Sequence, residues 1–256
     1  MCIRDRDEVL FLWRGAGYYS RARRLHALSQ IVETDYEGAL PSTYNELLAL
    51  PGIGPYTAAA VASIAFNHPV ACVDGNVRRV MARQTNKENP SVKDVQAFAD
   101  LNLVREHPGD WNQAMMELGA LICRPRNPLC DVCPVHESCK GTLRANDLPQ
   151  PKKQKKKRVE LRCVVKIDSH GRPELIQRPN SGLFAGLWGP QIESEIDTKG
   201  LEYLGSIRHV LSHRTMTVQV WKDTCKQGID PNNVALSTLD RRILTLAGVF
   251  LDVPSE

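Results

Sequence analysis

Four of the eight cysteines of this 256-residue chain fall within seventeen residues. They are spaced C-x6-C-x2-C-x5-C, at Cys123, Cys130, Cys133 and Cys139, in a segment that contains several prolines. Four thiolates on a short, turn-rich segment can bind one metal centre. The spacing favours an iron–sulfur cluster over a zinc ion, because structural zinc sites more often carry two C-x2-C pairs, and unligated thiols are the third possibility. The cysteine pattern also favours a reducing, cytosolic compartment over a disulfide framework.

A carboxylate and a glycine-containing turn form a second group of candidate residues. Asp74 lies in Val73-Asp74-Gly75-Asn76-Val77, directly before an expected helix. Taken alone, such an aspartate is most often a helix cap. Upstream, Leu50-Pro51-Gly52-Ile53-Gly54 can present consecutive N–H groups to a phosphate, or form an ordinary turn between two helices.

Two polar segments near the ends of the chain could contact bases. Tyr18 follows Gly15-Ala16-Gly17 and precedes Arg21 and two further arginines. Taken alone, this segment is compatible with a core tyrosine beside a solvated arginine face. Near the other end, Ser212 and His213 could hydrogen bond to a base edge or simply occupy a surface turn.

The elements that must position these residues change character along the chain. Thr43 and Glu46 form a capping box for a short helix, and Pro55 suits the first position of the next one. Helical spacing continues to residue 140, and after a Pro- and Lys-rich stretch apolar and polar residues alternate as in strands. The sequence predicts an all-α domain at 1–145, a basic linker at 146–160 and an α+β domain at 161–256.

Composition sets only broad limits on function. The formal net charge is +4, which is compatible with polyanion binding but does not establish it. No apolar run reaches the length needed to span a bilayer, so neither membrane insertion nor secretion is expected.

The cysteine loop, the residues Met115 to Ile122 before it and the hairpin at Leu50–Gly54 together resemble the endonuclease III superfamily of helix-hairpin-helix glycosylases. This resemblance implies a [4Fe-4S] cluster on the four cysteines, in a loop at 123–139. It also implies that Gly52, Ile53 and Gly54 anchor a DNA phosphate. Asp74 then stabilises the oxocarbenium-like sugar while Asn76 positions it.

A narrower resemblance concerns the subtype. Endonuclease III-type enzymes carry a nucleophilic lysine where this chain has Tyr56, which indicates a monofunctional glycosylase, although a packing tyrosine is the alternative. The Tyr18 segment is similar to the minor-groove reading segment of adenine glycosylases, which implies that the Tyr18 ring wedges between stacked bases while Arg21 and its neighbours hold phosphates. The C-terminal domain is also similar to that of adenine glycosylases, which is Nudix-like. Ser212 and His213 would there read 8-oxoguanine, with Leu211 in place of the family's phenylalanine.

The resemblance implies a DNA repair enzyme that removes adenine opposite 8-oxoguanine or guanine in double-stranded DNA and acts as a monomer. Its expected location is the cytoplasm, at the nucleoid, in a bacterium, and the nucleus or mitochondrion in a eukaryote. A mismatch thymine glycosylase of the same superfamily and a non-catalytic DNA-binding fragment are the alternatives.

One departure from the family concerns the start of the chain. Adenine glycosylases carry an upstream glutamate that protonates the leaving adenine, and no residue here matches it in context. We expect the chain to begin inside the family's domain, to be impaired in catalysis and to leave an apolar face of its all-α domain uncovered.

Overall fold

The computed structural model describes residues 5–150 and 156–252. The chain divides into two compact units. Unit 1 contains residues Met1–Ala27 and Lys153–Glu256, and unit 2 contains Leu28–Lys152. Among the described residues, no helix combines the length and apolar character needed to cross a membrane.

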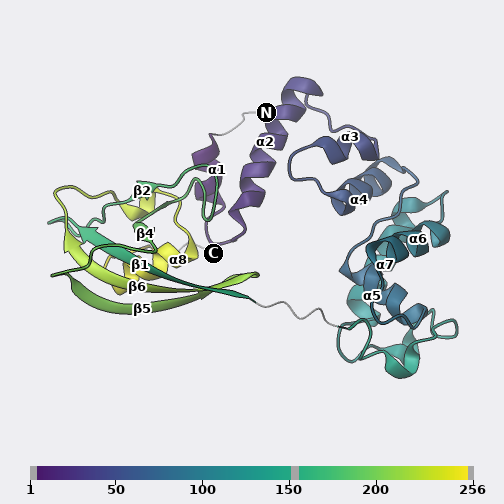
Figure 1. The fold of residues 1–256 in the computed structure, drawn as a ribbon. Coiled ribbons are helices and arrows are strands. Elements are labelled where there is room, and N and C mark those ends of the chain that lie inside the picture. The colour runs from purple at the N-terminus through teal and green to yellow at the C-terminus, as the bar shows by residue number, and fades with distance from the viewer. Residues whose placement is uncertain (1–4, 151–155, 253–256) are drawn as a thin grey trace. The chain divides into compact units, whose positions relative to one another are not determined.

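All regular secondary structure among the described residues of unit 2 is helical (Figure 1). It holds the end of α2 (Tyr19–Asp35), α3 (Tyr44–Ala49), α4 (Pro55–Phe66), α5 (Gly75–Gln84), α6 (Val92–Asn102) and α7 (Pro108–Glu117). A π-helical turn, η1 (Leu118–Ile122), extends α7, and two 3₁₀ turns follow, η2 (Cys130–Val132) and η3 (Thr142–Arg144).

The α3–α4 hairpin follows from local chemistry. Thr43 caps α3 through a hydrogen bond from the backbone N of Glu46, and Pro55 is the first residue of α4, as expected. The buried side chains of Leu47, Leu50, Ala58 and Ala62 hold the two helices together. The same helix α4 leaves Ile64 and Phe66 exposed, and the uncovered apolar face expected for this domain stays a prediction.

Unit 1 is built on a four-stranded sheet with the strand order β4-β1-β6-β5. The strands are β1 (Lys157–Ile167), β4 (Gln191–Glu193), β5 (Glu202–Val210) and β6 (Arg214–Thr224). β1 and β6 are parallel, while β1–β4 and β5–β6 are antiparallel. A second, two-stranded sheet joins β2 (Ile176–Gln177) to β3 (Trp188–Gly189).

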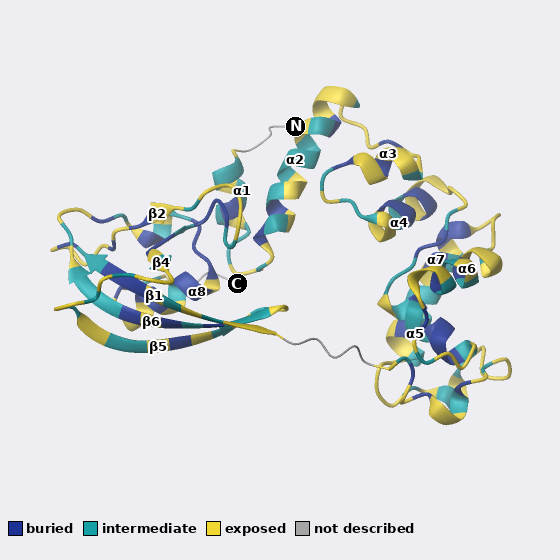
Figure 2. Cartoon of the chain, in the orientation of Figure 1, coloured by how far each residue is buried: buried dark blue, intermediate teal, exposed yellow. Residues whose placement is uncertain are grey.

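One face of the large sheet is covered by α8 (Thr238–Leu246), which follows the 3₁₀ turn η4 (Pro231–Asn233). Leu239, Ile243 and Leu244 of α8 pack on Val165, Val218 and their neighbours in the largest core cluster of unit 1. Figure 2 shows the buried inner residues of the strands beside exposed ones along β5. This alternation is what the sequence pattern predicted for the C-terminal domain.

The bounds of the two compact units differ from the expected domain boundaries. Helix α1 (Arg6–Leu12) and the start of α2 belong to unit 1, where Leu10 and Tyr19 are buried against Leu187 and Ala235. Residues 5–27 therefore form a compact unit with the sheet, and the expected bounds of the all-α domain, 1–145, stay a prediction. The sequence shows that helix α1 has an apolar face that must be buried, but it does not identify the element against which this face packs.

The expected linker at 146–160 is also shorter at both ends. Leu148 is buried, and its backbone O accepts a hydrogen bond from Nε of Arg83, while β1 begins at Lys157. Both ends are ordered because they find specific partners that composition does not reveal. Residues 151–155 lie outside the described part of the chain.

Candidate functional site

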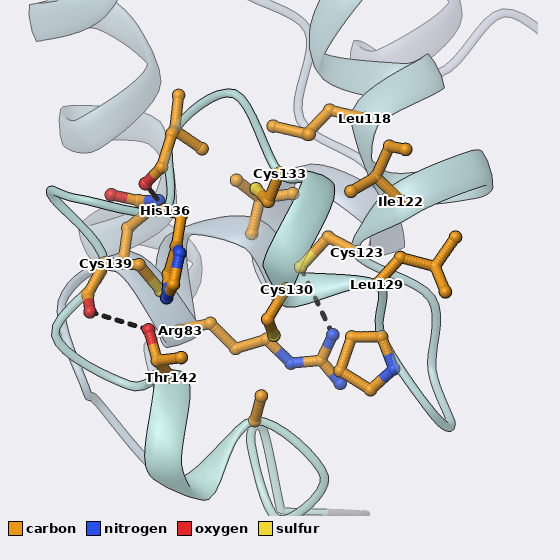
Figure 3. A pocket seen from close by; sticks show the side chains of 15 residues that line it. Arg83, Leu118, Ile122, Cys123, Leu129, Cys130, Cys133, His136, Cys139 and Thr142 are labelled. Carbon is orange, nitrogen blue, oxygen red and sulfur yellow. Dashed lines mark hydrogen bonds between the residues drawn. The ribbon is translucent and has the colours of Figure 1, made fainter.

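The four cysteines of the predicted cluster line a single pocket in unit 2 (Figure 3). They come from the end of η1, from η2 and from the loop that follows it. Apolar side chains of Leu118, Ile122 and Leu129 complete the wall. Apolar walls of this kind limit the access of water, which tunes a metal centre bound within them.

Helix α5 holds the cysteine loop in place. Nε2 of Gln84 donates to the backbone O of Val135 at 3.0 Å, and the backbone N of Lys140 donates to the O of Gln84 at 3.2 Å. Arg83 is 2% exposed, and its Nη1 donates to Sγ of Cys123 at 3.2 Å and to the O of Arg124 at 2.8 Å. The Arg83 guanidinium thus holds Cys123 and the segment after it by charge-assisted hydrogen bonds.

The donor set fits a thiolate-bound cluster. Burial raises the pKa of the Cys130 thiol, and so do the neighbouring thiols of Cys123, Cys139 and Cys133, while Arg83 lowers it. A thiol must lose its proton to bind a metal, so a positively charged centre is needed to make the Cys130 thiol a ligand. In the described residues, no three His, Cys, Asp or Glu side chains are grouped around the position of one metal ion. The four cysteines line their pocket together with apolar side chains and with polar ones, Arg83 and His136 among them.

The carboxylate of Asp74 caps α5 at the helix end opposite the cysteine loop. Its Oδ1 accepts a hydrogen bond from the backbone N of Val77 at 2.8 Å, and its Oδ2 accepts one from Nδ2 of Asn76 at 2.8 Å. Asp74 is thus both the helix cap and a half-buried, oriented carboxylate. The ten residues of α5 span about 15 Å, so one helix connects this carboxylate to the cysteine pocket.

Arg79 connects the Asp74 group with the cysteine loop. Its Nη2 donates to Oδ1 of Asn76 at 2.7 Å and to the backbone O of Gly119 at 2.6 Å. Its Nε donates to the backbone O of Cys123 at 2.7 Å. A Cβ on Gly119 would lie 2.5 Å from Cβ of Asn76, so only glycine permits this close approach of η1 and α5.

Tyr56 lies near Asp74, as the resemblance implied. Burial raises the pKa of the Tyr56 hydroxyl, and the negative charge of Asp74 raises it further. Burial also raises the pKa of Cys72 to about 11, with Asp74 again contributing. The hydroxyl of Tyr56 donates to Sδ of Met116 at 3.4 Å, and its ring stays 39% exposed. Tyr56 is therefore a neutral neighbour of the carboxylate.

The hairpin backbone is open to a ligand. Gly52 has a φ of +87°, which only glycine adopts readily, and Gly54 is the N-cap of the twelve-residue helix α4. No atom lies within 4 Å of a Cβ built on Gly54. The space on the Cβ side of Gly54, at the start of α4, is thus open to an approaching phosphate.

A pocket in unit 1 brings together the two segments that the sequence suggested for base contacts. Its lining includes Tyr18 and Arg23 from the start of α2, and Leu211, Ser212 and His213 from the β5–β6 turn. Phe184 and His209 lie between them, with ring centroids 6.2 Å apart in an edge-to-face arrangement. Burial lowers the pKa of His209, and Arg242 lowers it further, so this imidazole stays neutral at physiological pH.

Two aromatic residues of this pocket have strained backbone conformations. Tyr18 has a φ of +46° and Phe184 a φ of +56°, and they are the aromatic members of the described non-glycine residues with positive φ. Such conformations cost about 1–3 kcal/mol each and are typical of functional sites. Tyr18 is also 71% exposed, which excludes the alternative of a core tyrosine. Arg21 is exposed too, with its guanidinium 5.9 Å from the ring centroid of Trp13.

The predicted site residues fall into two coherent groups. Unit 2 holds the cysteines, the hairpin and Asp74 with Asn76 and Tyr56, and unit 1 holds Tyr18, Arg21, Ser212 and His213. Sequence reasoning missed Arg79, Arg83 and His209. The two arginines follow Asn76 at helical spacing on α5, and this spacing could have indicated that they lie on the same face of the helix.

Comparison with known proteins assigns these features to a class. A family model for the HhH-GPD superfamily base excision DNA repair protein matches residues 2–102, across the boundary between the units. A model for the iron-sulfur binding domain of endonuclease III matches residues 123–139. The chain has the helix-hairpin-helix glycosylase fold, and its cofactor is a [4Fe-4S] cluster rather than zinc.

Individual relatives narrow the class. Adenine DNA glycosylase of Arabidopsis thaliana is 38% identical over 72% of this chain and 32% of that protein. The Homo sapiens protein of the same name is 32% identical over 84% of this chain and 53% of its own length. The one from Buchnera aphidicola subsp. Baizongia pistaciae (strain Bp) is 30% identical over 89% of this chain and 70% of that protein.

The chain belongs to the adenine DNA glycosylase family. It spans about a third of the Arabidopsis relative and about half of the human one.

Proposed function

We propose that the chain is a monofunctional DNA glycosylase that removes adenine mispaired with 8-oxoguanine or guanine in double-stranded DNA. The pocket of unit 1 carries this proposal, because Tyr18 and the pair Ser212 and His213 line it together although they are far apart in the sequence. Such a pocket combines an exposed aromatic wedge with hydrogen-bonding groups that can sense the edge of an oxidised guanine.

Unit 2 contains the residues that we assign to base removal. Asp74 stabilises the oxocarbenium-like sugar, where a unit charge at 4 Å contributes about 4 kcal/mol at an effective dielectric near 20. Asn76 holds the carboxylate by its 2.8 Å hydrogen bond, and Tyr56 borders the site without acting as an amine nucleophile. The N–H groups around Gly52, Ile53 and Gly54 anchor a phosphate of the extruded nucleotide.

The four cysteines Cys123, Cys130, Cys133 and Cys139 are the proposed ligands of the cluster. The cluster, when bound, closes the loop and stabilises the folded state. Arg83 and Gln84 of α5 hold the ligand loop against the same helix that Asp74 caps.

In unit 1, we assign Tyr18 as the wedge, Arg21 as a phosphate contact, and Ser212 and His213 as readers of the lesion. The β-sheet domain is proposed to be Nudix-like and to bind the base without hydrolysing it. Its order of strands and the α8 helix packed on one face are compatible with an α+β reader domain.

Selective binding and base release together test this proposal. The holoprotein should bind a duplex with adenine opposite 8-oxoguanine more tightly than one with adenine opposite thymine, and Ser212→Ala should reduce that preference. With protein in excess at pH 6, slow adenine release should be detected by alkaline cleavage, with no strand cleavage before alkali. Asp74→Asn should abolish release.

Two outcomes would contradict the proposal. Release of thymine from a thymine:guanine duplex would make the chain a mismatch thymine glycosylase. Tight lesion binding with no base release at any pH would make it a binding module.

A further inference from the structure

The face of the large sheet opposite α8 carries a basic hollow that the lesion pocket does not use. On β1, Val159 and Leu161 pack with the core cluster, so Arg158 and Glu160 project from the other face. The residues that line the hollow come from three adjacent strands and the residue before β1. They are Lys156, Arg158, Val159, Glu160, Arg208, Thr215 and Thr217.

Strand register brings the cations together. Thr217 of β6 lies opposite Arg208 on β5 and opposite Glu160 on β1, and Thr215 lies opposite Arg158. Arg158 and Arg208 therefore lie two strands apart and are offset by two residues along the strands, about 12 Å at the backbone, which long side chains can bridge.

The hollow has an excess of positive charge. Lys156, Arg158 and Arg208 are exposed, and Glu160 is the one carboxylate in the lining. Across the described residues, the ion pairs involve none of these three cations. Cations without a protein partner at a concave surface attract a polyanion.

The hollow adjoins the turn that carries the lesion readers. Arg208 precedes Ser212 by four residues, which is about 13 Å along a strand. The backbone N of Lys157 donates to the O of His213 at 3.1 Å, so the start of β1 lies beside the same turn. Because a duplex rises 3.4 Å per base step, phosphates about four steps from the recognised base fall at this distance.

We propose that this hollow binds backbone phosphates of the DNA that flanks the base read by Ser212 and His213. The inference rests on the proposed function, because that function places DNA against the β5–β6 turn. Arg158, Arg208 and Lys156 neutralise the phosphates, and the threonine hydroxyls add hydrogen-bond donors. Glu160 opposes binding and limits the affinity of the hollow.

The salt dependence of duplex binding tests the inference. Arg158→Gln and Arg208→Gln are made in the full-length holoprotein, and affinity for undamaged and lesion-containing duplexes is measured from 50 to 200 mM salt. Each variant should lower the slope of log affinity against log salt by about 0.9, which shrinks the salt-induced loss of affinity about 3.5-fold. Glu160→Gln should strengthen binding.

Lys226→Gln is the matched control, because Lys226 is an exposed lysine of unit 1 beyond the far end of β6. It should leave the slope unchanged. The inference is wrong if Arg158→Gln and Arg208→Gln behave like this control. It is also wrong if they weaken binding to a polyglutamate peptide but not to the duplex, because the hollow would then dock an acidic protein. The same titrations also measure the preference for the lesion-containing duplex over the undamaged one. This preference tests the proposed function independently of the hollow.

Discussion

At the scale of single residues, Arg79 is the side chain on which the geometry of unit 2 depends most. It donates to Asn76, which orients Asp74, and to backbone oxygens of Gly119 and Cys123 in the cysteine segment. Hydrogen bonds from a charged donor contribute about 1.5–3 kcal/mol each. One guanidinium thus ties the carboxylate and the cluster loop to the same helix.

We expect Arg79→Gln to lower the free energy of unfolding of unit 2 by about 2–4 kcal/mol, because a shorter neutral amide cannot replace all three hydrogen bonds. Urea unfolding followed by the absorbance of the cluster measures the change. Lys93→Gln on α6 removes the same charge from an exposed site and should cost less than about 0.5 kcal/mol. Equal midpoints for the two variants would show that Arg79 has no such role.

At the scale of elements, Asp168 stabilises the turn after β1 through hydrogen bonds from backbone N–H groups. Its Oδ1 accepts hydrogen bonds from the backbone N of His170 and Arg172, and its Oδ2 accepts from the N of Gly228. Burial acts to raise the pKa of Asp168, but these N–H groups and the Arg172 guanidinium lower it below its usual range. A carboxyl with a lowered pKa stabilises the fold above its unfolded pKa and loses this effect as pH falls through the folded value.

Asp168→Asn should therefore lower the urea midpoint of unit 1 at pH 7. The difference from the unmodified protein should begin to shrink as the pH falls below about 4, the ordinary pKa of aspartate, because the carboxyl group of the unfolded chain then binds a proton. It is lost fully only below the lowered pKa of the folded protein. Glu195→Gln, at an exposed carboxylate of the same unit, serves as control and should leave the midpoint unchanged. A gap between Asp168→Asn and the unmodified protein that is constant down to strongly acidic pH would contradict this assignment.

The elements also show what the sequence could predict. The α3–α4 hairpin and the cap at Asp74 follow from neighbouring residues, so local patterns predicted them. The parallel pairing of β1 with β6 and the docking of α1 on unit 1 depend on distant partners, which alternation cannot identify. Arg79 and Arg83 were not predicted as site residues for the same reason, since their partners lie in the cysteine segment.

At the scale of the whole molecule, the described residues contain the reader pocket, the proposed catalytic carboxylate and the cysteine loop. We propose that no carboxyl group of the described residues protonates the leaving adenine, so that the adenine takes its proton from the solvent. The release rate should then rise about tenfold for each unit that pH falls between 8 and 6. Single-turnover release from an adenine:8-oxoguanine duplex measures this slope, with Asp74→Asn as the inactive control. A fast rate that levels off across this range would mean that a residue of the chain supplies the proton, and the assignment of Asp74 as the one catalytic carboxylate would be wrong.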